Sequence, residues 1–158
     1  MRNFNFFLKK VPAPKPSQRK SQNVVIVLAE FALDLMRAFR EFNKENFKDT
    51  SPGLLRIGIS HGKVMAGVVG SSKPLYDVWG NSVNMASRMD STGVPGRIQV
   101  TSETAAVLQH FGIECEFRGE IHVKGRGEIP TYFIGIDDEL NFKRRNPNSF
   151  RPAFETKL

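Results

Sequence analysis

An amide and a permanent cation stand four residues apart near the middle of the chain, in the stretch NSVNMASR. Val83, Ala86 and Met89 recur at helical spacing here, which predicts a helix. On such a helix Asn84 and Arg88 share one face. A rigid pair of this kind suits a ligand that carries a ribose or a negative charge. Asn and Arg are also common on solvated helix surfaces, so the spacing alone leaves both interpretations open.

A long helix is predicted ahead of this pair. It begins at Asn23, a favourable cap residue, after the Pro-containing stretch VPAPKPSQRKSQ. Apolar residues on one side and polar residues on the other recur at spacings of three and four, as a helix requires. The apolar stripe consists of Leu28, Phe31, Leu35, Phe39 and Phe42, and the polar face carries Glu30, Asp34, Arg37 and Glu41.

Strands are predicted on both sides of the central helix. The stretch LLRIGISHGKVMAGVVG predicts two strands of one hairpin with a tight turn at His61 and Gly62. The residues YDVWG that follow are expected at the start of the central helix. After it come a short strand, RIQVT, a short helix begun by Thr101 or Ser102, and strands that turn at 125–127. This order predicts an α+β fold with a largely antiparallel sheet.

The net charge of +7 resides in the ends of the chain. Residues 1–22 carry six bases and no acid, and residues 138–158 carry five bases against three acids. The segment 23–137 is therefore nearly neutral. We predict one domain over 23–137, between a basic linker or tail at 1–22 and a C-terminal tail at 138–158. Solvated, flexible tails are the favoured explanation of this charge, and a weak contact with nucleic acid or lipid is the alternative. No nucleic-acid partner is expected.

Cysteine usage and hydropathy indicate the compartment. Cys115 is the single cysteine, so it forms no internal disulfide, and a reducing compartment such as the cytosol is expected. No apolar run approaches the ~20 residues that a membrane-spanning helix needs. The sequence therefore predicts a chain without a transmembrane segment.

Three longer stretches carry a family resemblance. They read LRIGISHGKVMAGVVG, LYDVWGNSVNMASRMDSTGVPGRIQVTSET and RGEIHVKGRGEIPTYFI. In order and spacing they resemble the second cytoplasmic catalytic domain of animal membrane-bound adenylyl cyclases, of the class III nucleotide cyclase family, over about Val24 to Ile136. The resemblance implies a ferredoxin-like catalytic domain truncated at its N-terminal side. It also implies a parent enzyme whose catalytic domains lie at the cytoplasmic face of the plasma membrane.

The resemblance assigns site residues for the conversion of ATP to cyclic AMP and pyrophosphate. Asp77 matches the acceptor of the adenine amino group, with Val78 along the same base edge, and a buried acceptor there favours adenine over guanine. Asn84 matches the residue that orients the ribose. Arg88 matches the cation that stabilises charge on the α-phosphate, and Lys124 the one that contacts the polyphosphate leaving group. Lys124 lies beside a glycine turn, so the alternative interpretation is a solvated surface charge on a hairpin.

Two further positions match regulatory contacts of the family. Trp79 matches a residue that lines an apolar cleft between the paired domains, where the activator forskolin binds, although an ordinary core tryptophan is an equal alternative. Phe47 matches a contact with the stimulatory G-protein α subunit, although a loop phenylalanine can also fold into the core.

The metal-binding residues of the family have no match in this chain. Class III cyclases bind two Mg²⁺ (or Mn²⁺) ions through two aspartates, both upstream of the matched region. Asp34, in FALDL, imitates part of the first motif, but its periodicity assigns it to the long helix. The three histidines, His61, His110 and His122, show no ligand spacing.

The sequence leaves two functions open. The first is an adenylyl cyclase half-domain, inactive alone, whose metal ions are bound by the first catalytic domain of a pseudo-symmetric dimer. The alternative is a catalytically inactive cyclase-like module that pairs with a cyclase domain and regulates it. The retained site residues favour the first, and the missing upstream region favours the second.

Overall fold

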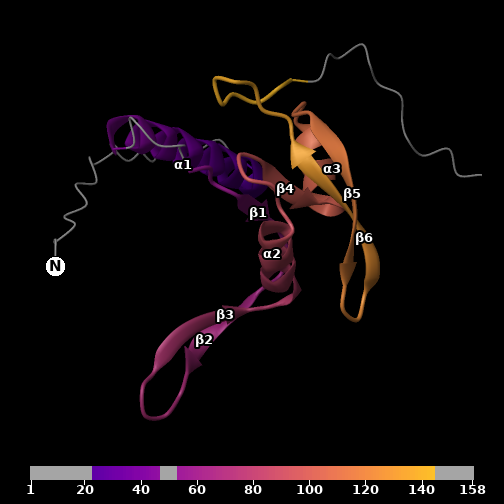
Figure 1. Ribbon diagram of the computed structural model, residues 1–158. Coiled ribbons are helices and arrows are strands. Elements are labelled where there is room, and N and C mark those ends of the chain that lie inside the picture. Colours follow the sequence, from indigo (N-terminus) through magenta and orange to yellow (C-terminus); the bar gives the residue numbers. More distant parts are fainter. Residues whose placement is uncertain (1–22, 47–52, 145–158) are drawn as a thin grey trace, which may run out of the picture.

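The computed structural model describes residues 23–46 and 53–144. Helices are interspersed with strands along the chain (Figure 1). They are α1 (Val24–Asn46), β1 (Ile57–Ile59), β2 (Met65–Val69), β3 (Leu75–Trp79), α2 (Asn81–Ser91), β4 (Ile98–Thr101), α3 (Ser102–His110), β5 (Cys115–Val123) and β6 (Gly127–Ile134). No helix in these ranges is long and apolar enough to cross a bilayer.

The strands form two separate sheets. The larger has the order β1-β4-β6-β5, in which β1 and β4 run parallel and the other neighbouring pairs run antiparallel. The smaller is the antiparallel hairpin of β2 and β3, which extends away from the larger sheet (Figure 1). The predicted α+β fold with a largely antiparallel sheet is confirmed.

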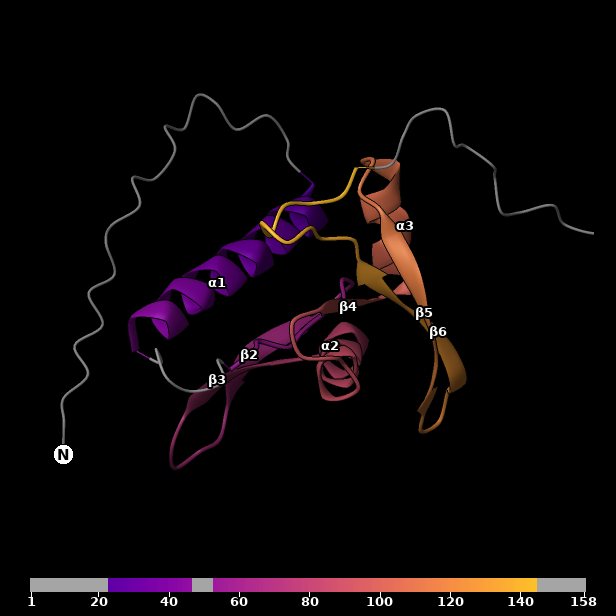
Figure 2. The ribbon, with the colours of Figure 1, turned by 45° about the horizontal axis from the view of Figure 1, so that its top comes forward.

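Alternation along β4 assigns the helices to opposite faces of the larger sheet. Ile98 and Val100 are buried in the main core with residues of α1 and α3, whereas Gln99 contacts Met89 of α2 on the other face. Figure 2 shows the three helices around β4. A second, smaller cluster joins α2 to β5 and β6. It consists of Met85, Met89, Ile121 and Val123, with Ile129 against it.

The predicted hairpin around His61 and Gly62 is wrong. β1 pairs in parallel with β4, and β2 pairs instead with β3, with Met65 opposite Trp79. The chain reverses at residues 70–74, where Gly70 has a φ of 97° that favours glycine. Alternating apolar residues indicate a strand but not its partner, which explains the error. The residues YDVW are likewise a strand and not the start of the helix, because α2 begins after Gly80.

The apolar stripe predicted on α1 is not the face that packs on the core. Leu28 and Phe31 are 39 % and 57 % exposed, while a neighbouring stripe is buried. The buried stripe consists of Val25, Ala29, Ala32, Leu33 and Met36. The helix carries apolar residues on two adjacent faces, so the spacing of apolar residues alone does not show which face is buried.

The predicted starts of α1 and α3 and the predicted last turn are confirmed. Asn23 Oδ1 accepts a hydrogen bond from Val25 N at 2.9 Å, and Thr101 Oγ1 accepts one from Thr104 N at 3.4 Å. β5 and β6 are joined by a turn in which Gly125 and Gly127 have φ angles of 82° and 76°. Left-handed backbone at both positions explains why two glycines flank this turn.

The described part of the predicted C-terminal tail packs against α1. Arg37 donates to the carbonyl of Leu140 at 2.6 Å, and Arg40 donates to that of Asp138 at 2.7 Å. Leu140 itself is only 4 % exposed. Packing therefore continues beyond residue 137.

Candidate functional site

A surface pocket of about 520 Å³ lies between α2 and the turn that joins β5 to β6. It brings together Asn84, Arg88 and Lys124, which the sequence analysis assigned to one site although they lie on separate elements. Its complete lining is Asn81, Asn84, Met85, Ser87, Arg88, Val123, Lys124, Gly125 and Arg126. The lining residues that are not among the predicted site residues are Asn81, Met85, Ser87, Val123, Gly125 and Arg126. Asn81 could have been found from its spacing of three to Asn84 on the same helix.

The pocket is strongly electropositive. Arg88, Lys124 and Arg126 line it, and none of its lining residues is acidic. Within the described parts of the chain, no hydrogen bond or ion pair occupies the side chains of these three cations or of Asn84. Cations gathered without acidic neighbours raise the local concentration of anions and favour a polyanionic ligand. The guanidinium of Arg88 also offers paired donors that match phosphate oxygens.

Helical periodicity explains why α2 presents these side chains to the pocket. Met85 and Met89 are 5 % and 0 % exposed and anchor one side of the helix against β5. Asn84 and Arg88 precede them by one residue each, so they lie about 100° around the helix axis from the anchored side. Buried methionines therefore fix the rotation of α2 that directs Asn84 and Arg88 to the pocket.

The two residues expected to read the base lie elsewhere, on β3. Asp77 and Val78 are exposed and do not line this pocket, and Asp77 Oδ1 accepts a hydrogen bond from Val78 N at 2.8 Å. Asp77 is paired across the hairpin with Gly67. The expectation of a buried acceptor is therefore not met within this chain.

Trp79 and Phe47 were the predicted regulatory positions. Trp79 ends β3 and is 40 % exposed, so it is not a core tryptophan. It lies over Gly67, where an added Cβ would be 3.6 Å from its ring. Phe47 lies outside the described residues.

The pocket is unsuited to holding a metal ion with this chain alone. Its lining offers three cations and no carboxylate. Nor do three or more His, Cys, Asp or Glu residues gather into a possible metal site anywhere in 23–46 and 53–144. Asp34 lies within α1, as its periodicity predicted, and it pairs there with Arg37 at 2.9 Å. Divalent cations prefer carboxylate oxygens, which the lining of this pocket does not offer.

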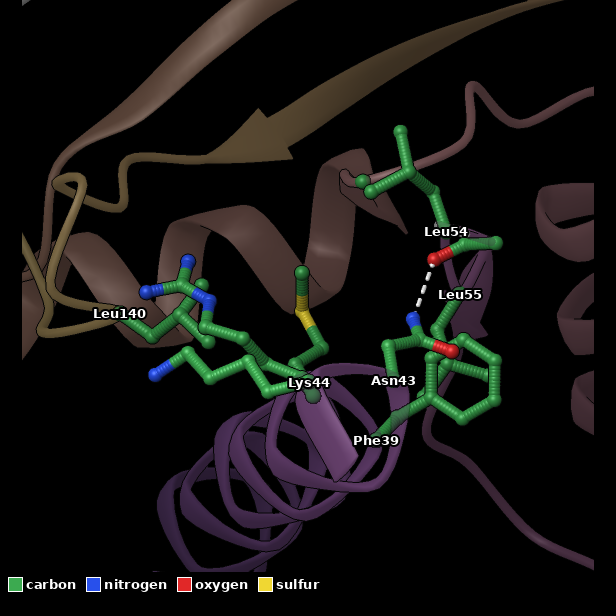
Figure 3. Close-up of a pocket in the computed structure, with 10 residues that line it drawn as sticks. Phe39, Asn43, Lys44, Leu54, Leu55 and Leu140 are labelled. Atoms are coloured by element: carbon green, nitrogen blue, oxygen red, sulfur yellow. Dashed lines mark hydrogen bonds between the residues drawn. The ribbon is translucent and has the colours of Figure 1, made fainter. Parts of the chain in front are cut away.

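A larger pocket of about 630 Å³ lies beside the second half of α1 (Figure 3). Apolar side chains line most of it, including Phe39 and Leu54, with Lys44 near them. Asn43 donates to the carbonyl of Gly53 at 2.7 Å there. None of the residues predicted to act on a nucleotide lines this pocket, so its size does not make it the candidate site.

Comparison with known proteins gives a family match. The model of the adenylate and guanylate cyclase catalytic domain matches residues 8–135. The chain is 53 % identical over 131 residues to adenylyl cyclase X E of Drosophila melanogaster, covering 80 % of this chain and 12 % of that protein. It is 48 % identical over 109 residues to adenylate cyclase type 9 of Gallus gallus, covering 66 % of this chain and 8 % of that protein.

Solved structures agree with the family match. The catalytic core of a rhodopsin-guanylyl cyclase with converted specificity, in complex with ATPαS, is 30 % identical with a TM-score of 0.57 and covers 70 % of this chain and 58 % of its own. The adenylyl cyclase CyaB from P. aeruginosa shares the fold with a TM-score of 0.62 at 23 % identity, covering 72 % of this chain and 59 % of its own. The chain thus spans little more than half of each of these structures, and about a tenth of the two curated relatives.

Proposed function

The chain belongs to the adenylate and guanylate cyclase catalytic domain family, and on that premise we propose that it is an adenylyl cyclase half-domain that contributes to the conversion of ATP to cyclic AMP and pyrophosphate. One observation carries the proposal. Asn84, Arg88 and Lys124 line a single electropositive pocket, although they come from α2 and from the β5–β6 turn. Class III cyclases work as dimers on nucleotides and use divalent metal ions.

In the proposed reaction the 3′-oxygen of the ribose attacks the α-phosphate, and the bond from the α-phosphorus to the pyrophosphate oxygen breaks. Asn84 orients the ribose so that its 3′-oxygen approaches in line. Arg88 donates to the α-phosphate as negative charge grows on its oxygens, and Lys124 stabilises charge on the departing pyrophosphate. Divalent metal would supply further charge neutralisation, from ligands outside the described part of this chain.

A partner catalytic domain completes the proposed site. The β2–β3 hairpin offers a surface for it, because Met65 and Leu75, which share one face of the hairpin with Asp77, are 66 % and 65 % exposed. Clustered apolar side chains at that exposure are typical of an interaction surface. Asp77 lies on the same hairpin, so a partner docked on it would bury the carboxylate and allow it to read the adenine amino group. The first catalytic domain of an adenylyl cyclase, with its metal aspartates, fits this role.

The other regulatory contacts expected from the resemblance belong to this assembled form. Trp79, exposed at the end of β3, would line an activator cleft once the partner is bound. Phe47 is the proposed contact of a stimulatory G-protein α subunit. The assembled enzyme is proposed to work at the cytoplasmic face of the plasma membrane.

The proposal is tested by mixing the purified chain with a first catalytic domain from an animal adenylyl cyclase and measuring cyclic AMP from ATP and Mg²⁺ or Mn²⁺. Cyclic AMP from the mixture, with none from either component alone, is the expected result. Binding without turnover would favour the alternative, a catalytically inactive module that pairs with a cyclase domain and regulates it.

A further inference from the structure

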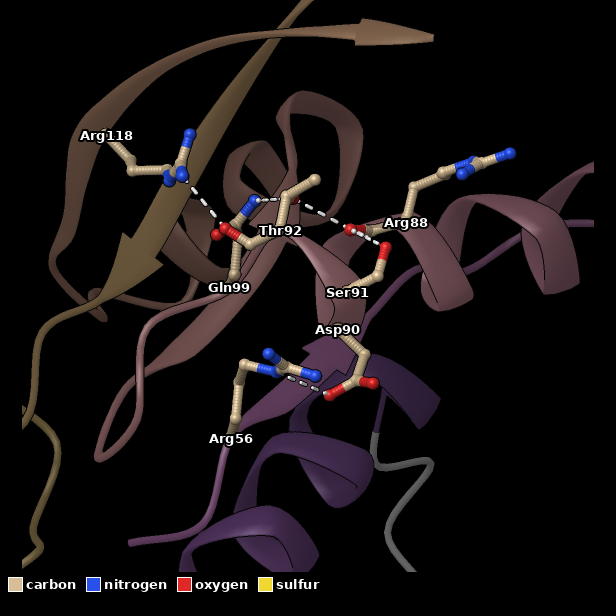
Figure 4. A network of polar contacts seen from close by, with 7 residues as sticks. All are labelled: Arg56, Arg88, Asp90, Ser91, Thr92, Gln99 and Arg118. Atoms are coloured by element: carbon tan, nitrogen blue, oxygen red, sulfur yellow. Dashed lines mark hydrogen bonds and ion pairs between the residues drawn. The ribbon is translucent and has the colours of Figure 1, made fainter. Parts of the chain in front are cut away.

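A chain of hydrogen bonds ties the carboxyl end of α2 to the interior of the larger sheet. Gln99 of β4 donates from Nε2 to Thr92 Oγ1 at 3.0 Å, and the Thr92 hydroxyl donates to the carbonyl oxygen of Arg88 at 2.8 Å (Figure 4). The backbone amide of Thr92 donates to the same carbonyl at 3.0 Å. The backbone at Arg88 is therefore held by a residue that follows α2 and, through it, by the sheet.

Burial of the Gln99 amide at this position costs free energy that a purely structural role does not require. Its side chain is fully buried between the strands and α2, and its Oε1 has no hydrogen-bond partner among the described residues. A buried acceptor left unpaired costs about 1 to 3 kcal/mol. An apolar side chain, such as those of its neighbours Ile98 and Val100, would fill the position without that cost. The amide group is thus best explained by what it holds, which is the Thr92 hydroxyl.

Two further contacts immobilise the same short segment. Arg118 of β5 donates to the carbonyl of Thr92 at 2.8 Å, and Arg56, just before β1, pairs with Asp90 at 3.3 Å (Figure 4). The guanidinium of Arg88 points away from this network in the same view. Contacts from β4, from β5 and from the residue before β1 thus anchor the backbone around Arg88, while its guanidinium remains available to a ligand.

We propose that Gln99 and Thr92 are positioning residues for Arg88, a role that rests on the proposed function of Arg88 at the α-phosphate. Neither side chain lines the pocket. Both act through the backbone of Arg88, because a long side chain reaches a fixed point in space only if its backbone is fixed. A shift of about 1 Å at a group that acts in the transition state costs on the order of 100-fold in rate. Loosening of the carboxyl end of α2 is therefore expected to lower kcat more than it weakens the binding of ATP.

The test uses the full chain with the first catalytic domain, and compares kcat and KM for ATP. Thr92→Val keeps the shape but removes the hydroxyl, and is expected to lower kcat about tenfold, with KM within about twofold. Thr92→Ser retains the hydroxyl and is expected to restore kcat. Gln99→Met removes the donor together with the unpaired acceptor, so it is expected to lower kcat without lowering the melting temperature.

Ser91→Ala is the matched control. The Ser91 hydroxyl donates to the same Arg88 carbonyl, at 3.3 Å, but it is exposed and has no link to the sheet. Turnover is expected to stay within about twofold of the unmodified chain. Hydrogen exchange at the Thr92 amide gives a readout without turnover, and is expected to accelerate in Thr92→Val and Gln99→Met but not in Ser91→Ala.

Arg88→Ala in the same assay distinguishes the proposed function of Arg88 from the positioning role of Gln99 and Thr92. Full turnover in Thr92→Val and Gln99→Met, with turnover lost in Arg88→Ala, would overturn the positioning role and leave the proposed function intact. Equal losses in Thr92→Val and Thr92→Ser would also overturn it. Unchanged turnover in Arg88→Ala, or no cyclic AMP from the unmodified pair, would reject the proposed function and the positioning role with it.

Discussion

Gly58 of β1 lies directly against the backbone of Asp90 in α2. A Cβ added to Gly58 would be 2.1 Å from Asp90 N and 2.6 Å from the carbonyl oxygen of Ala86. Backbone atoms cannot yield as a flexible side chain does, so glycine is required here by close approach. This contact sets how near α2 lies to the sheet, and thereby where Asn84 and Arg88 enter the pocket.

Replacement of Gly58 by alanine is expected to destabilise the fold by about 2 kcal/mol or more, because overpacking forces α2 away from β1. Urea unfolding followed by circular dichroism measures the change. Gly67→Ala is the control, since an added Cβ there meets only the ring of Trp79, at 3.6 Å. Equal stability of the two variants would show that α2 can shift without strain.

Removal of the Arg88 guanidinium is expected to affect the chemical step more than binding. In the assembled enzyme Arg88→Ala should lower kcat on the order of 100-fold, because charge on the α-phosphate grows in the transition state. Asn84→Ala should act in the same direction, since a misplaced ribose spoils the approach of the 3′-oxygen. Steady-state kinetics measure both. The control is Lys143→Ala, an exposed cation remote from the pocket, which should retain full turnover.

The identity of residue 77 is expected to set the nucleotide preference. Asp77→Cys should reduce the ratio of kcat/KM for ATP over GTP by about tenfold or more, because loss of a buried acceptor removes about 1 to 3 kcal/mol from the fit. Asp77 is exposed in the single chain, so this effect should require the partner domain. Nucleotide competition assays on the assembled enzyme give the ratio. A constant ratio would mean that Asp77 does not read the base.

Cys115 is expected to be a poorly reactive thiol in the folded chain. Burial, with the Glu114 carboxylate as the smaller cause, raises the pKa of Cys115 to about 12. The thiolate is the reactive form, so at pH 8 the folded protein should react with an aromatic disulfide about 100-fold or more slowly than the chain unfolded in urea. Because the folded state favours the protonated thiol, this group destabilises the fold only as the pH rises above the pKa of the unfolded thiol. Equal rates with and without urea would contradict the effect of burial.

The sequence by itself determined the local features of this protein. The caps at Asn23 and Thr101, the glycine turn after Lys124 and the helical pairing of Asn84 with Arg88 all depend on residues a few positions apart. Short-range chemistry of this kind is readable without a fold. The long ordered motifs also carried the family resemblance, which the family match over residues 8–135 confirms.

Only the tertiary structure decided which strands pair and which face of α1 is buried. Alternation predicted β1 and β2 correctly as strands but joined them in a hairpin, because the pattern of side chains on one strand does not specify its partner. The helix α1 carries two apolar stripes, and the stripe with the bulkier side chains, which includes Leu28 and Phe31, is the exposed one. The contact of Gly58 with Asp90 joins segments that are distant in sequence and are brought together by packing, and the hydrogen bond from Gln99 to Thr92 depends on how β4 lies against the end of α2. For that physical reason, neither the placement of α2 nor the support of Arg88 could be predicted from local sequence patterns.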